Sequence, residues 1–241
     1  MILDDFQCYR SKVTRNTPPF VEVLGTKFVD HFTLIGSPPG HLIVNAKKMT
    51  SVCAPVDVNG QDPTAPSHPE HEVGYRIRIA PDTAKFTKVP NQQVINSEFG
   101  TLFIDVLRPA QLLLTSHKSL VSSPPAPVSP TNDNFSCYKI RTTRNTPKFV
   151  PVTGVMLDDQ FGPTIMTVLK PTMLCAPANV DDLDPGAESH AGMLLCFKLK
   201  RPSTTPKFTT QTPVYINNQW GPLTTDVKTR DQLCVKTQLV P

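Results

Sequence analysis

Four segments of the chain open on the same alternation, in which apolar positions are separated by basic ones. The clearest of them reads Tyr75-Arg76-Ile77-Arg78-Ile79. A period of two sends neighbouring side chains to opposite faces of a β-strand. The pattern therefore predicts strands near residues 8–12, 74–78, 137–141 and 196–200, each with one buried face and one basic face that points to solvent.

These segments recur within a longer spacing that indicates an internal repeat. From Cys137, aromatic residues follow at Phe149 and Phe161 and the segment closes at Cys175, at intervals of 12, 12 and 14 positions. The segment 196–234 keeps the same intervals. Spacing that returns at a fixed period predicts that each copy is one unit of structure.

Two further copies lie upstream and depart from the pattern. In the first, an insertion at residues 36–40 delays the closing Cys53. In the second, Gly74 and Leu113 stand where the other copies have cysteines. An aromatic-glycine corner precedes the last segment of copies two to four, where we expect the glycine to allow a special turn over a buried ring.

The copies alternate in type, which predicts how they combine into domains. Copies one and three share Thr-Arg-Asn-Thr-Pro at 14–18 and 143–147, and copies two and four share Lys-Phe-Thr at 85–87 and 207–209. One copy of about 50 residues is small for a domain, whereas a pair reaches the usual size. We expect two tandem β-sandwich or barrel-like domains, and four independent modules are the alternative. The first domain would span 1–120 (copies 6–55 and 73–116), a Pro/Ser-rich linker 121–134, and the second domain 135–241 (copies 135–177 and 194–237).

The fold class is predicted as all-β. No window shows sustained helical spacing, because proline interrupts every candidate, and 26 prolines occur in the chain. We expect about 16 short strands, four per copy. The second strand of a copy, as at 149–152, would lie at an edge or a bulge, because Pro90 and Pro151 interrupt it in copies two and three.

The cysteines predict disulfides within copies. Copy two lacks both its opening and its closing cysteine, as expected if these two positions pair with each other; buried free thiols are the alternative. Each bridge would contribute about 3–4 kcal/mol on the chain-entropy model. Because the cysteines share strand parity with the basic residues, we expect the bridges at a sheet rim or on its solvent side. The predicted pairs are Cys8–Cys53, Cys137–Cys175 and Cys196–Cys234.

Charge and hydropathy exclude several classes. The balance of 24 basic and 20 acidic residues gives a net charge of +4, which is too mild to indicate nucleic acid as a partner. No run approaches the ~18 apolar residues of a membrane span. The N-terminus shows neither a basic leader nor an apolar core, so we expect no signal peptide in this sequence. Since disulfides form in oxidising compartments, the sequence favours an extracellular or cell-surface location, as a mature form or a segment of a longer protein.

The basic face of the opening strands is the candidate ligand-binding surface. A ladder of basic side chains would bind a polyanion such as an acidic polysaccharide. The alternative is a solvated strand face whose charges discourage pairing between edges. The candidate residues are Arg10, Lys12, Arg76, Arg78, Lys139, Arg141, Lys198 and Lys200.

Two connectors carry candidate metal ligands. Alternating carboxylates are typical of the first half of a calcium loop, although the closing glutamate is missing from the first connector. His68 and His71, beside glutamates, are candidates for a transition metal. Ordinary solvated loops are the alternative, so we expect no cofactor, with calcium as the exception to test. The candidate calcium ligands in the connectors are Asp57, Asn59, Asp62, Asp181, Asp182 and Asp184.

No catalytic residue is assigned. The chain has no Gly-x-Ser-x-Gly motif, no glycine-rich phosphate loop and no cysteine without a predicted partner. Repetition without a unique polar cluster favours a non-enzymatic binding or structural module. The alternatives are a secreted enzyme acting on a polymer (a hydrolase or metal-dependent oxidase, with its site at the domain cleft or the copy-one insertion) and a self-associating filament subunit.

The repeat motif resembles tandem repeats of secreted proteins from environmental bacteria, over nearly the whole chain. The resemblance implies an extracellular setting and nothing about mechanism. Copy two departs from it by lacking the cysteines. The residues that carry it are Cys137, Tyr138, Lys139, Phe161, Gly162, Lys170, Pro171, Leu174, Cys175 and Pro177.

Overall fold

The computed structural model describes residues 4–36, 40–81, 83–96 and 98–240, and its regular structure is almost entirely β. Within these ranges no helix has the length and apolar character needed to span a membrane. Each sequence copy contributes three strands. They are β1 (Phe6–Val13), β2 (Val23–Asp30) and β3 (Leu42–Val58); β4 (Glu70–Ile79), β5 (Val89–Asn96) and β6 (Gly100–Ser119); β7 (Phe135–Thr142), β8 (Val152–Asp159) and β9 (Thr164–Val180); β10 (Gly192–Lys200), β11 (Gln211–Asn218) and β12 (Gly221–Val240). The helical pieces are α1 (His31–Leu34), η1 (Ala65–Ser67) and η2 (Ala187–Ser189).

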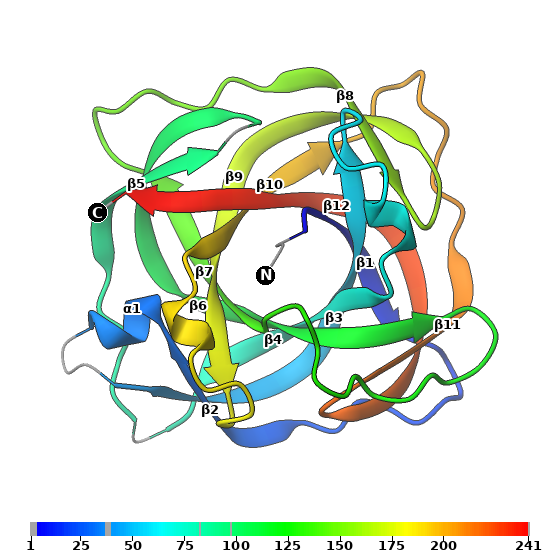
Figure 1. Cartoon of the computed structure of the whole chain (residues 1–241), viewed down its shortest axis with the longest axis horizontal. Helices are drawn as coiled ribbons and strands as arrows, with labels where there is room; N and C mark the ends of the chain where they lie inside the picture. Colours follow the sequence, from blue (N-terminus) through cyan, green and yellow to red (C-terminus); the bar gives the residue numbers. More distant parts are fainter. Residues whose placement is uncertain (1–3, 37–39, 82, 97, 241) are drawn as a thin grey trace.

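Eight of the strands close into a ring, which Figure 1 shows in a view down the molecule's shortest axis. Neighbours pair antiparallel in chain order: β1, β3, β4, β6, β7, β9, β10 and β12. The last strand then pairs with the first, so that Phe6 lies opposite Cys234. The two ends of the chain are thereby joined in one hydrogen-bonded ladder.

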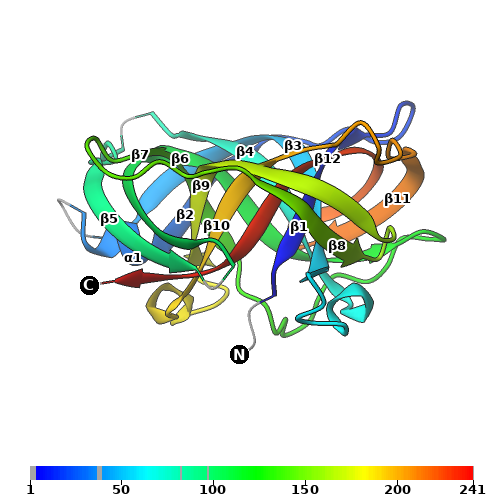
Figure 2. The ribbon, with the colours of Figure 1, turned by 90° about the horizontal axis from the view of Figure 1, so that it is seen from above.

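The four remaining strands lie outside the ring and connect opposite copies. β2 pairs with β3 of its own copy and with β9, and β8 pairs with β9 and with β3. β5 and β11 do the same with β6 and β12, and they lie at opposite ends of the long axis in Figures 1 and 2. All twelve strands belong to one sheet. The predicted tandem domains are therefore not confirmed, because strands of both halves pair throughout.

The all-β prediction is confirmed, with twelve strands in place of about 16. The expected second strand of each copy is a loop instead, and the pieces expected before and after the corner form the outer strand and the long strand of the copy. Prolines in these loops remove backbone donors that a ladder requires. Each loop packs a phenylalanine against the opening strand of the next copy, and the loop of copy four packs against the opening strand of copy one. The ring centroids lie 5.0 Å apart for Phe20–Tyr75, 4.9 Å for Phe86–Tyr138, 4.9 Å for Phe149–Phe197 and 4.9 Å for Phe208–Tyr9.

The outer strands end at polar corners that link copies two places apart. Tyr9 donates a hydrogen bond to Asp159 (2.6 Å) and Tyr138 donates one to Asp30 (2.6 Å), so copies one and three exchange equivalent contacts. Asn218 donates to Tyr75 at 3.0 Å in the same way. Beside these residues Gly162 and Gly221 both have φ of 93°, which confirms the predicted glycine turn at the corner.

Candidate anion-binding site

Three disulfides clip the ring strands together, with the predicted partners. They join Cys8 to Cys53, Cys137 to Cys175 and Cys196 to Cys234. Each pair stands directly opposite in an antiparallel ladder, with Cα atoms 3.8–3.9 Å apart. The described cysteines include none that is free.

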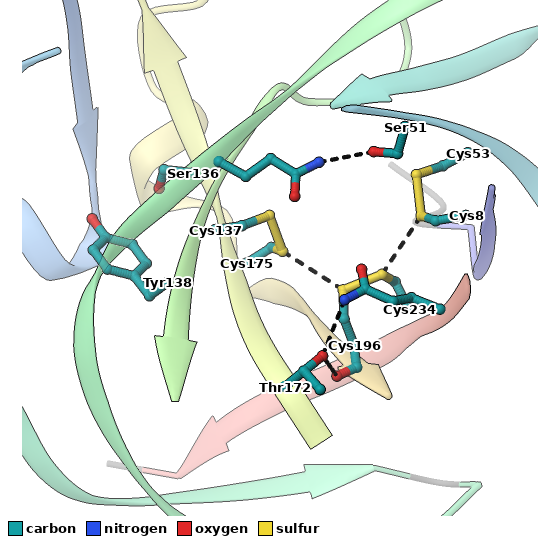
Figure 3. The surroundings of a disulfide bond; sticks show 12 residues. Cys8, Ser51, Cys53, Ser136, Cys137, Tyr138, Thr172, Cys175, Cys196 and Cys234 are labelled. Carbon is teal, nitrogen blue, oxygen red and sulfur yellow. Dashed lines mark hydrogen bonds between the residues drawn. A yellow bond between two sulfur atoms is a disulfide. The ribbon is translucent and has the colours of Figure 1, made fainter. Parts of the chain in front are cut away.

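The cystines lie inside the ring, which corrects the expectation that they would sit at a rim or in solvent. Every cysteine is at most 3% exposed. The sulfurs of different bridges also touch: Cys8 Sγ lies 3.8 Å from Cys234 Sγ, and Cys175 Sγ lies 3.7 Å from Cys196 Sγ (Figure 3). Ring closure turns the strand face shared by cysteines and basic residues into an interior. The tyrosine face points the other way, into the main core beneath the outer strands.

Copy two fills its cystine position with a polar bridge. Gly74 stands opposite Leu113 there, and the Gln111 amide donates to the Ser51 hydroxyl at 2.9 Å. A Cβ on Gly74 would lie 1.8 Å from Gln111 Nε2 and 2.2 Å from Ser51 Oγ. A side chain at this position would displace the bridge, because Gln111 and Ser51 occupy its space.

Above the cystines the ring opens into a cavity of about 820 Å³. Cys8, Gln111, Met173 and Gln232 are among the residues that line it. Seven basic side chains line it against a single carboxylate, Asp231, among the described residues. We call this cavity the basic mouth, and its basic residues are Arg10, Lys12, Lys48, Arg76, Arg78, Arg108 and Lys139.

The basic mouth contains five of the eight predicted ligand-binding residues. Arg141, Lys198 and Lys200 lie outside it; the first forms an ion pair with Asp105 at 2.8 Å and the second with Asp231. The sequence argument missed two members that come from the long strands. A signal for them existed, because a basic residue stands five positions before the closing position in three copies. These residues are Lys48, Arg108 and Lys170, of which the first two line the cavity.

Charge is unevenly distributed around the basic mouth. Arg10 pairs with Asp231 at 3.0 Å, and Lys12 lies 3.6 Å from Asp226. On the other side, Lys48 stands directly opposite Arg76 in the ladder between β3 and β4. Arg108 stands opposite Lys139 between β6 and β7 in the same way. Like charges at directly opposite positions destabilise a sheet, and an anion placed between them would relieve this repulsion.

The histidines proposed for a metal serve different local contacts. His68 hydrogen-bonds Asp4 at 3.0 Å, and His190 makes the equivalent contact with Asp133 at 2.9 Å. His71 is buried, with Nδ1 3.0 Å from the carbonyl oxygen of Pro69. Burial, with a smaller effect of nearby Lys118, lowers the pKa of His71 to about 3. His68 and His71 therefore act in separate contacts, and within the described ranges no three His, Cys, Asp or Glu residues form a metal-holding group.

In the acidic connectors, several side-chain oxygens already accept hydrogen bonds from the connector itself or from a neighbouring strand. Asp57 Oδ1 accepts from the backbone of Asp62 at 2.9 Å, and Asp62 Oδ1 accepts from Thr64. Asn59 Oδ1 accepts from the backbone of Met156 at 3.1 Å. In the second connector, Asp181 accepts from the backbone of Lys27 at 3.0 Å and Asp182 pairs with the Lys27 ammonium at 3.0 Å. Asp184 contributes its backbone N–H to Asn179. Calcium binding here stays a prediction.

The two locations suggested for an enzyme's site were the copy-one insertion and a cleft between domains. Residues 37–39 of the copy-one insertion lie outside the described residues. The predicted domain cleft depended on the tandem layout, which the single sheet does not confirm. In comparisons with known proteins, no family model matches the chain, and neither a curated protein nor a solved structure matches it.

Proposed function

We propose that this protein is an extracellular, disulfide-stabilised module that binds a polyanion, such as an acidic polysaccharide, at its basic mouth. The observation that carries the proposal is the meeting of seven basic side chains around one cavity with one carboxylate. Those side chains come from five different strands of the ring, so the fold gathers charge that is dispersed along the sequence.

The extracellular part of the proposal is supported by three buried disulfides. Such bridges form and persist in oxidising compartments. The resemblance to repeats of secreted bacterial proteins points the same way. We also propose that the four copies are internal repeats of one unit, since each supplies an opening, an outer and a long strand with corresponding pairings.

The physics of such a site predicts a particular salt response. Single exposed basic groups attract an anion weakly, but several around one cavity add their potentials. Arginine also presents donors in a planar fork that matches anionic oxygens in pairs. Binding through the cavity should weaken with salt and still survive near 0.15 M, where the Debye length is about 8 Å.

The first prediction tests the cavity against general surface charge. Replacing Arg76 and Arg108 by alanine should weaken binding of a sulfated polysaccharide such as heparin by about tenfold or more, because each lost charge-assisted bond is worth roughly 1.5–3 kcal/mol. Isothermal titration calorimetry at low and moderate salt measures the effect.

The matched control replaces Arg15 and Arg144 by alanine. Both are exposed, lie outside the cavity and remove the same two charges. This control should change affinity by less than about threefold, the size of a screened surface charge. Equal losses in the two double variants, or no binding by the unaltered protein, would refute a site at the basic mouth.

A further inference from the structure

The basic mouth has one neutralised side and one open side. On the neutralised side, the Asp231 carboxylate of β12 contacts both Arg10 and Lys198. Three positions before the closing position, the other copies carry no acid: the equivalent residues are Thr50, Ala110 and Thr172. Only copy four therefore places a carboxylate at this level of the ring.

The open side gathers basic residues from four consecutive ring strands, β3, β4, β6 and β7. Within the described residues, none of them has a carboxylate within 4.0 Å or makes a side-chain hydrogen bond. Directly opposed side chains have Cβ atoms about 5 Å apart, so the charges repel one another. An anion between them would remove that repulsion. The residues are Lys48, Arg76, Arg78, Arg108 and Lys139.

The floor of the mouth limits which shapes of anion can enter the cavity. Cys8, Leu113 and Met173 are buried in the packed interior of the ring, so a chain cannot pass through it. Beside them the Ser51 hydroxyl accepts from Gln111, and both polar side chains line the cavity. The cavity thus suits a group that enters from one end and is met by neutral polar groups below and cationic groups at the side.

We propose that the open side binds a compact group bearing several sulfate or phosphate esters, which enters the mouth end-on. A tetrahedral oxyanion presents three oxygens and can accept from guanidinium groups on neighbouring strands at once, whereas a carboxylate presents two. Arg76, Arg78 and Arg108 supply these forks, and Lys48 and Lys139 flank them as point charges. This inference rests on the proposed function and names the chemical group that the site recognises.

The test compares three probes by titration calorimetry at about 0.15 M salt, where long-range surface attraction is screened. Sucrose octasulfate and inositol hexakisphosphate are compact and distinguish sulfate from phosphate esters. Polygalacturonate is a polymer of carboxylates. We expect at least one compact probe to bind with one-to-one stoichiometry and more tightly than a galacturonate segment of equal charge.

Two charge-matched variants locate the site. Arg76→Ala with Arg108→Ala should weaken the compact probe by about tenfold or more, as expected for lost charge-assisted bonds. Arg15→Ala with Arg144→Ala removes the same two charges from exposed positions outside the mouth, and should cost less than about threefold. Thermal unfolding of each variant confirms that it is folded.

The outcomes separate the two proposals. If polygalacturonate or heparin binds at the mouth and neither compact probe does, the inference is overturned and the polyanion-binding function stands. If the two double variants lose the compact probe equally, the assignment to the open side is overturned. If no probe binds at all, both proposals fail.

Discussion

Two buried aspartates, Asp30 and Asp159, are among the carboxyl groups that make the stability of this fold depend on pH. They stand at equivalent ends of β2 and β8, and each accepts a tyrosine hydroxyl from the opposite copy. Burial raises the pKa of each from the ordinary value of 3.8 to about 6, against the opposing effect of their hydrogen bonds. Their folded pKa thus exceeds the unfolded one, so the folded state binds the proton more tightly. The stability they contribute is complete below about pH 4 and is lost as pH rises through about 6.

This sign gives a prediction for Asp159→Asn. The variant should remove part of the decline in unfolding free energy between pH 4.5 and 7.5, by roughly 1–3 kcal/mol. The fold accepts asparagine at this corner, because Asn96 and Asn218 stand at the equivalent positions of β5 and β11. Urea unfolding at the two pH values measures the change.

The exposed neighbour provides the control, since Asp158→Asn should leave the pH profile of stability unaltered. Comparing variants also cancels the opposite contribution of His71. Its lowered pKa makes the folded state lose stability as pH falls below the ordinary value of 6.5. A profile of Asp159→Asn that matches the unaltered protein would show that this carboxylate does not carry the effect.

At the scale of elements, the cystines and the loop aromatics hold neighbouring strands by different means. The bridges clip an opening strand to the long strand of its own copy, whereas the loop phenylalanines reach the next copy. Copy two has no bridge and yet completes the ring through β4 and β6, with the Gln111–Ser51 contact in that place. Hydrogen-bonded ladders therefore define the ring, and the bridges stabilise it.

We accordingly expect the ring to survive the loss of one bridge. Cys137→Ala with Cys175→Ala should lower the unfolding free energy by about 3–5 kcal/mol, through a less constrained unfolded chain and lost core packing. Circular dichroism should still report the native β spectrum, and urea unfolding gives the loss. A variant that is unfolded without denaturant would show that the bridges are needed to form the ring.

At the scale of the whole molecule, the two sequence halves form one closed structure. The halves meet where β6 pairs with β7 and where β12 pairs with β1, and the outer strands add four further ladders between them. None of the three disulfides crosses from one half to the other. Cutting the linker therefore tests the architecture without a covalent bond to obscure the result.

We predict that the halves stay together after such a cut. A protease site inserted at the exposed Val128, followed by cleavage, should leave a complex that elutes at the 26.6 kDa of the intact chain. Denaturing electrophoresis of the same fraction should show two fragments. The uncut chain with the inserted site is the control. Two separate folded halves in solution would instead restore the tandem-domain organisation.

Part of the candidate site was readable from sequence and part was not. Alternation at 74–78 correctly placed Tyr75 in the core, and it selected Arg76 and Arg78 as exposed basic residues. Lys48 and Arg108 were not selected, because they lie on other strands and join the site only through long-range pairing. Nor did alternation reveal that the cystine face would become an interior.

The sequence by itself determined the strand class and the partners of each cysteine. These follow from local periodicity and from the joint loss of both cysteines in copy two, and neither requires knowledge of the neighbours. The tertiary structure alone decided that four copies close into one ring, which face is inside it and where the basic residues meet. The physical reason is that a period of two shows which residues share a strand face but not which face becomes the interior. Only closure of the ladder between β1 and β12 decides which face lies inside the ring.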